Sequence, residues 1–125
     1  MLRFMRPFRS LRVWHEAHEL TLALYKATGS FPRNEQYGLT SQIRRSAASV
    51  CANLAEGCGR RSDADFARFV QIALGSASEL EYHVLLAADL SFLDATQRSA
   101  LDTSVTNVKR MLTGLARKLR TADRG

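Results

Sequence analysis

The chain has few of the residues that cross-link or interrupt small domains. Its 125 residues include only two cysteines and two prolines, so neither a disulfide framework nor a proline-rich linker organises it. Cys51 and Cys58 would lie about 10 Å apart along one helix, which is too far for a disulfide. Two cysteines without a second pair of ligands also make a poor zinc site. We therefore expect free, buried thiols.

Long apolar runs are also missing. No run approaches the roughly 20 apolar residues that a membrane-spanning helix needs, so we expect no membrane partner. Residues 1–14 carry arginine at every third position and lack the apolar block of a signal peptide. The sequence therefore predicts a cytoplasmic protein. With 46% hydrophobic residues, the chain can form one folded domain.

Acidic residues are too few to balance the basic ones. The chain has 12 acidic and 18 basic residues, which gives a net charge of +6 and a pI near 10.0. Only Lys26, Lys109 and Lys118 are lysines, so 15 of the 18 basic residues are arginines. Such a charge favours a polyanionic partner, although a GC-rich genome would also enrich arginine.

Residue patterns for catalysis are scarce. His15 and His18 lie close to Glu16 and Glu19, but the order is not HExxH, and the chain has no Glu-x-x-His pair of the kind found in di-iron bundles. We therefore predict a non-enzymatic protein without a metal or cofactor. Metal-dependent catalysis through the two histidines is an alternative hypothesis. It would be rejected if the purified protein contained no stoichiometric metal.

Apolar residues recur with helical periodicity in four segments, which predicts an all-α fold. Ser10, Ser62 and Asp94 are the expected N-caps of the first, third and fourth helices. The expected helices cover about residues 11–28, 35–56, 63–90 and 95–121. Short connections then predict an antiparallel up-down four-helix bundle over residues 11–121. A basic N-terminal arm (1–10) precedes it, and a C-terminal tail (122–125) follows.

The second of these helices has little solvated surface. Beside its apolar stripe runs a polar stripe, and the remaining side is mostly alanine. Because an exposed helix normally keeps a broad charged side, this helix is predicted to be covered on more than one side by copies of the same chain. The polar stripe consists of Gln42, Arg45, Ser49, Asn53 and Glu56.

The polar stripe has two interpretations: a hydrogen-bonded network that fixes helix packing or subunit register, or a contact to a ligand. Arg45 and Glu56 are about three turns apart, so we expect them to pair between helices rather than with each other. In the third helix, Gly75 and Tyr82 lie away from the core stripe. A glycine inside a helix costs about 1 kcal/mol relative to alanine, so Gly75 predicts the close approach of another backbone.

Three groups of arginines are candidates for nucleic-acid binding. In the arm they alternate with Phe4 and Phe8, a combination that suits RNA or single-stranded DNA. A second group lies beside the N-terminus of the third helix, where a phosphate could bind. The third group lies along the last helix, on the side opposite its leucines. Solvated surface charge is the alternative in each case. The groups are Arg3, Arg6, Arg9 and Arg12; Arg60 and Arg61; and Arg110, Arg117, Arg120 and Arg124.

Three motifs occur together in the middle of the chain: SQIRR, NxAEGxGRxS and IAxGSxxELE. With LRVWHEAHEL before them, they resemble the bacterial four-helix-bundle family named for proteins encoded in intervening sequences of large-subunit ribosomal RNA genes. The resemblance covers about residues 8–94. One departure is Cys51, where the family often has proline, a change that removes a kink from the second helix.

The resemblance implies an antiparallel four-helix bundle that assembles into a ring-shaped homo-oligomer, typically a pentamer, without an established activity. Similar proteins that assist reverse transcriptases in retroelements bind nucleic acid, which makes RNA, DNA or a reverse transcriptase possible partners. We therefore expect an accessory, RNA-binding role. The alternative is a scaffold that binds proteins and no nucleic acid.

Overall fold

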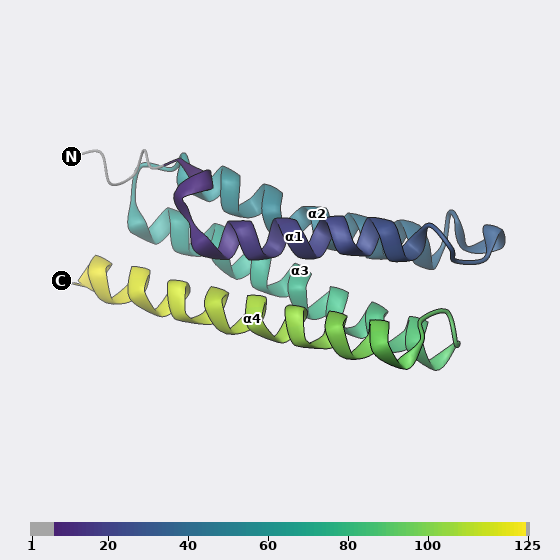
Figure 1. Ribbon diagram of the computed structural model, residues 1–125. Helices are drawn as coiled ribbons and strands as arrows, with labels where there is room; N and C mark the ends of the chain where they lie inside the picture. The colour runs from purple at the N-terminus through teal and green to yellow at the C-terminus, as the bar shows by residue number, and fades with distance from the viewer. Residues whose placement is uncertain (1–6, 125) are drawn as a thin grey trace.

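The computed structural model describes the backbone of residues 7–124 and the side chains of residues 7–122. This part of the chain is all-α, with four long helices and no strand (Figure 1). The helices are α1 (Arg12–Thr28), α2 (Leu39–Cys58), α3 (Asp63–Asp89) and α4 (Ala95–Arg124), and two short 3-10 turns are η2 (Phe8–Ser10) and η3 (Arg33–Glu35). The ring-shaped assembly is not part of this single-chain structure.

Successive helices run antiparallel, and their apolar stripes meet in one core (Figure 1). α2 packs on α3, α3 packs on α4, and α1 closes the arrangement against both α2 and α4. This is consistent with the predicted up-down four-helix bundle. Leu54, Leu80 and Leu112 are completely buried, so each of these helices contributes its stripe to the interior. None of the described helices combines the length and apolarity that a membrane crossing requires.

The antiparallel course gives the bundle two distinct ends (Figure 1). We call one the termini end: it contains the start of α1, the α2–α3 turn and the end of α4. We call the other the loop end: it contains the α1–α2 connection (29–38) and the α3–α4 connection (90–94).

The beginnings of the first two helices differ from the sequence prediction. Leu11, not Ser10, is the N-cap of α1, because the Ser10 hydroxyl donates instead to the carbonyl of Pro7 at 2.7 Å. α2 begins at Leu39 rather than near Glu35. The Glu35 carboxylate reaches forward and accepts a hydrogen bond from the Leu39 N–H at 3.0 Å, so it satisfies the amide end of the helix from outside.

The other helix boundaries agree better with the sequence prediction. The Ser62 hydroxyl accepts from the Asp65 N–H at 3.1 Å, and Asp94 Oδ1 accepts from the Gln97 N–H at 2.7 Å, so both predicted N-caps are confirmed. α2 continues through Cys51 to Cys58, two residues beyond the predicted end. α4 is helical to Arg124, so the predicted tail is helix as far as the structure describes it.

Neither cysteine forms a disulfide in the described part of the chain, as predicted. Cys58 is buried, whereas Cys51 is half-buried on the side of α2 that faces α1. The Cys51 sulfur lies 3.6 Å from the hydroxyl of Thr21. Burial raises the pKa of the Cys51 thiol above its ordinary value of 9.0, because the thiolate would lose solvation there.

Candidate nucleic-acid interface

The termini end collects arginines that are far apart in the sequence. The start of α1, the α2–α3 turn and the last turns of α4 lie toward the same end because neighbouring helices run in opposite directions, with the end of α4 extending beyond the start of α1 (Figure 1). All of these arginines are exposed except Arg60, which is half-buried. They are Arg9, Arg12, Arg60, Arg61, Arg117 and Arg120.

On α4 the predicted arginine stripe faces solvent. Arg110, Arg117 and Arg120 are exposed, whereas Leu112 and Leu119 on the opposite side are buried. Lys109 differs from these arginines, because its ammonium group donates to Glu81 Oε1 at 2.8 Å and links α4 to α3. The free charge of this surface is therefore carried by the arginines and by Lys118, which is exposed.

At the α2–α3 turn the two predicted arginines differ. Arg60 Nη2 donates to Glu56 Oε2 at 2.6 Å, and its guanidinium lies 4.6 Å from the centre of the Phe69 ring. Its charge is therefore compensated within the chain. Arg61 is exposed and is the better candidate for a phosphate. The Asp65 amide is bonded to Ser62, as the predicted N-cap requires, so the start of α3 has one donor fewer for a phosphate.

The aromatic residues near the start of α1 pack against one another. The Phe8 and Trp14 rings lie 4.8 Å apart, and His18 stacks on Trp14 at the same distance. His15 Nε2 lies 2.8 Å from the carbonyl oxygen of Arg9, which holds η2 against α1. Phe8 and the two histidines therefore have structural contacts, and Arg9 is left exposed.

Some predicted residues lie outside the described part of the chain. Arg3 and Arg6 precede it, and the side chain of Arg124 is not among those described. Their assignment to the nucleic-acid interface stays a prediction.

The polar stripe of α2 divides into two parts. Ser49 Oγ hydrogen-bonds Ser76 Oγ of α3 at 2.8 Å, and Asn53 Nδ2 donates to the Ser49 carbonyl at 2.8 Å and to its hydroxyl at 3.1 Å. Ser49 and Asn53 therefore join a hydrogen-bonded network with Ser76, which the prediction did not include. Gln42 and Arg45 are exposed on the solvent side. Glu56 pairs instead with Arg60 in the α2–α3 turn, four residues further along the chain, so within the chain it is not paired with another helix as predicted.

Gly75 makes no close backbone contact within the described chain. A Cβ atom built on it would meet nothing within 4 Å, because this part of α3 faces solvent. Within the described chain no other backbone approaches Gly75, so the predicted approach stays a prediction for contact with a second copy. Tyr82 lies on the same exposed side with 57% of its surface accessible, together with Ile72 and Leu85.

A basic and aromatic cluster at the loop end was not predicted. Arg44 Nε donates to Thr28 Oγ1 at 2.9 Å, and Arg44 Nη2 donates to the carbonyl of Tyr25 at 3.1 Å. The guanidinium also lies 4.6 Å from the centre of the Tyr25 ring. Tyr37 lies in the connection just before α2, and 90% of its surface is exposed. Sequence reasoning missed the cluster because its members come from two helices and a loop. The adjacent Arg44-Arg45 pair was the available signal.

Potential catalytic groups are dispersed. The described residues contain no group of three or more histidine, cysteine or acidic side chains that could hold a metal ion. His83 is mostly buried, and neither of its ring nitrogens has a hydrogen-bond partner among the described residues. Its nearest ion-pair contact is Glu79 Oε2, at 3.5 Å. This geometry does not assemble a nucleophile with a base.

Comparison with known proteins agrees with this fold. A crystal structure of a protein with unknown function from the S23 ribosomal protein family of Bacteroides thetaiotaomicron superposes with a TM-score of 0.73 at 28% sequence identity. The similarity covers 83% of this chain and 97% of that one. No curated protein matches the chain. The family model described as 23S rRNA-intervening sequence protein matches residues 9–114. The chain belongs to this family.

Proposed function

We propose that the protein is a non-enzymatic, cytoplasmic homo-oligomer that binds RNA in an accessory role, through phosphate contacts with little readout of the bases. The observation that carries the proposal is that several segments with exposed arginines lie at the same end of the bundle, the termini end of Figure 1. Arginine binds phosphate bidentately, and neutralising several phosphates releases counterions, which supplies affinity without sequence preference.

The carboxylates at this end leave most of that charge uncompensated. Glu56 pairs with Arg60, and Asp65 pairs with Arg68 at 3.0 Å. No acidic partner is found for Arg61, Arg117 or Arg120 among the described residues. These three arginines lie on two different helix ends, so they can contact phosphates from different turns of one RNA strand.

Self-assembly would multiply this surface. The outer sides of α2 and α3 carry small and apolar side chains, which support burial against another subunit. The exposed residues on these sides include Ala48, Ala52, Ile72, Gly75, Tyr82 and Leu85. Gly75 offers no side chain, so a helix of a second copy could approach α3 closely there. In a ring, which the family resemblance suggests is a pentamer, weak phosphate contacts add through avidity.

A fluorescence anisotropy titration with a labelled, structured RNA tests the RNA-binding proposal. Binding is expected at 50 mM salt and should weaken by at least tenfold at about 200 mM, since several phosphates are neutralised. The same titration with an unrelated RNA of equal length should give a similar affinity. An absence of binding at the lower salt, or an affinity that salt does not change, contradicts the proposal.

The exposed apolar side of α3 also supports a second candidate, a scaffold that binds another protein. Affinity capture from a lysate with and without nuclease separates the two functions. Material lost after nuclease treatment supports RNA binding, whereas a specific protein that remains bound supports the scaffold. Analytical ultracentrifugation tests the assembly itself, and a single sedimenting subunit at high concentration would contradict the ring.

A further inference from the structure

The loop end contains a groove that the termini-end proposal does not use. Two cavities, of about 260 Å³ and 410 Å³, lie side by side because they share Gln36, Thr40 and Arg44 in their walls. Arg33 lines the smaller cavity, and Arg45 lines the larger one. Both cavities are open to solvent, and the larger one falls within the roughly 300–1,000 Å³ that sites for small ligands commonly occupy.

Arg44 is held in place at the junction of the two cavities. Its guanidinium donates to the Thr28 hydroxyl and to the Tyr25 carbonyl, and it stacks on the Tyr25 ring. These contacts use the Nε–H and one of the two N–H bonds of Nη2. The other guanidinium N–H groups remain able to donate to a ligand. An arginine fixed in this way loses little conformational entropy when it binds an anion.

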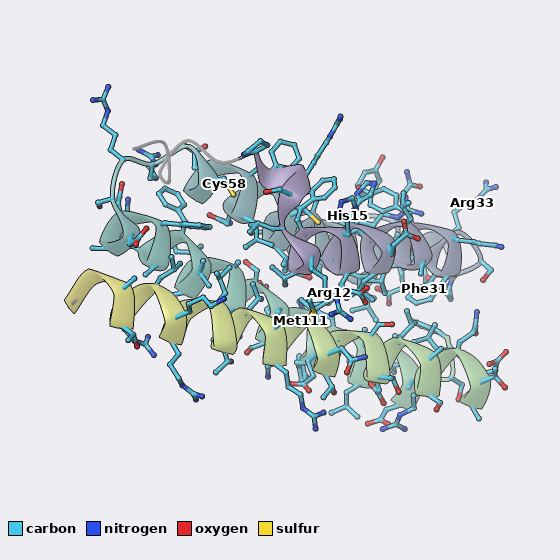
Figure 2. All side chains as sticks on the ribbon, turned by 60° about the vertical axis from the view of Figure 1, so that its left-hand side comes forward. Arg12, His15, Phe31, Arg33, Cys58 and Met111 are labelled. Carbon is cyan, nitrogen blue, oxygen red and sulfur yellow. The ribbon has the colours of Figure 1, made fainter. Side chains whose placement is uncertain are left out.

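The charge of the groove is of one sign. Arg33, Arg44 and Arg45 contribute guanidinium groups, whereas none of the described residues that line either cavity is acidic. Glu35 lies on the same loop, but its carboxylate is bonded to the Leu39 N–H and is not part of either wall. Figure 2 shows Arg33 extending outward at this end of the bundle. The groove therefore favours an anion.

Aromatic surface lies beside these cations. Tyr25 and Tyr37 both line the larger cavity, and their exposed fractions are 45% and 90%. One side of Tyr25 is covered by Arg44, whereas Tyr37 offers nearly its whole ring. Stacking of a base on an exposed aromatic side chain is a common device in single-strand recognition.

We propose that this groove binds a nucleoside phosphate, with the phosphate held by Arg44 and Arg45 and the base stacked on Tyr37. Arg33 adds to the positive potential over the smaller cavity. The ligand chemistry is shared by a free mononucleotide and by one nucleotide of a single strand. The site is separate from the arginines of the termini end, so its existence does not depend on RNA binding there.

Calorimetric titration of the full-length protein with AMP, adenosine and inorganic phosphate tests the groove directly. Anisotropy with a labelled 12-nucleotide oligoadenylate tests the strand. Tyr37→Ala and Arg45→Ala should each weaken the binding of the cognate probe by about tenfold, since one stacking contact or one phosphate contact is lost. Tyr37→Phe retains the ring and should bind like the wild type, and Lys26→Ala controls for the loss of one charge from the same end.

The probes distinguish the two sources of the ligand. AMP binding with this pattern of variants identifies a free nucleotide, and oligoadenylate binding with the same pattern but no AMP binding identifies a strand. Adenosine that binds as tightly as AMP would overturn the phosphate assignment. The proposal also fails if Tyr37→Ala and Arg45→Ala leave both probes unaffected. It fails equally if these variants change the sedimenting species instead of the ligand affinity, because a second copy would then occupy the groove.

Discussion

The two ends of the bundle present positive charge in different ways. At the termini end, exposed arginines lie on separate helices and on the α2–α3 turn. At the loop end, Arg44 is fixed by Thr28 and Tyr25 beside a groove. A spread of exposed charges suits a long polyanion of any sequence, because each contact is weak and many add. A fixed guanidinium beside a hollow suits a small ligand, because its position is set before binding.

The largest expected effect is on RNA affinity. It tests whether the position of the positive charge matters or only its amount. The triple variant Arg61→Ala, Arg117→Ala, Arg120→Ala should weaken RNA binding about a hundredfold, or about 3 kcal/mol, and lower the salt slope by about 3. Anisotropy at several salt concentrations measures both. The control triple Lys26→Ala, Arg68→Ala, Arg98→Ala removes the same charge from residues that belong to neither proposed site. Equal losses in the two triples would show that only net charge matters.

The second prediction concerns the turn that positions Arg61. A Cβ on Gly57 would lie 2.8 Å from Phe66 Cδ1 and 2.9 Å from Phe69 Cβ. Gly57→Ala should therefore destabilise the protein by roughly 1–3 kcal/mol, because α2 and α3 must separate there. Urea denaturation measures the change.

Gly59 provides the matched control for this substitution. A Cβ there would come no closer than 3.6 Å to the Glu56 carbonyl oxygen, and the backbone has an ordinary helical conformation. Gly59→Ala should therefore change stability by less than about 0.5 kcal/mol. Similar losses for the two variants would contradict the packing described for the turn.

A third prediction tests whether Arg44 is held as described. Arg44→Lys retains the charge but loses the fork that reaches Thr28 and the Tyr25 carbonyl together, so stability should fall by about 1 kcal/mol. Thermal denaturation compares this variant with Arg45→Lys, which changes an exposed side chain and should be neutral. An Arg44→Lys protein as stable as the wild type would mean that these hydrogen bonds add no stability and that the loop end is no more pre-organised than the termini end.

The smallest effect concerns Cys51, in the middle of the bundle between the two ends. Its pKa is raised by burial, so above about pH 9 the unfolded chain loses the thiol proton first, and stability falls as pH rises through the folded-state pKa. Below that range Cys51 adds no pH dependence. In a Cys58→Ala background, thiol alkylation at pH 8 should be several-fold slower than in denatured protein. Equal alkylation rates in folded and denatured protein would mean that the Cys51 thiolate is exposed to solvent.

Much of the bundle follows from residues close together in the sequence. Apolar residues at helical spacing predicted α1 to α4, and Ser62 and Asp94 predicted two helix starts, because a cap depends on amides only three residues away. Ser10 failed as a cap because Pro7 offers its hydroxyl another acceptor. The start of α2 was missed because Glu35 caps it from outside the helix, which no local preference encodes.

The candidate sites were predicted less completely. The exposed arginines of α4 could be read from their positions opposite Leu112 and Leu119, but Arg60 is neutralised by Glu56, and Lys109 is engaged by Glu81 on another helix. The cluster around Arg44 combines Tyr25 and Thr28 from α1 with residues of the following loop and helix. Such a cluster arises only when α1 and α2 lie against each other.

The sequence by itself determined the helices, the apolar face of each and the excess of arginine, because these depend on periodicity and composition. Tertiary structure alone decided which arginines share an end of the bundle and which one is fixed beside a groove. The physical reason is that charges and hydrogen bonds act over a few ångströms in space, and antiparallel packing brings together residues that the chain separates by up to its whole length.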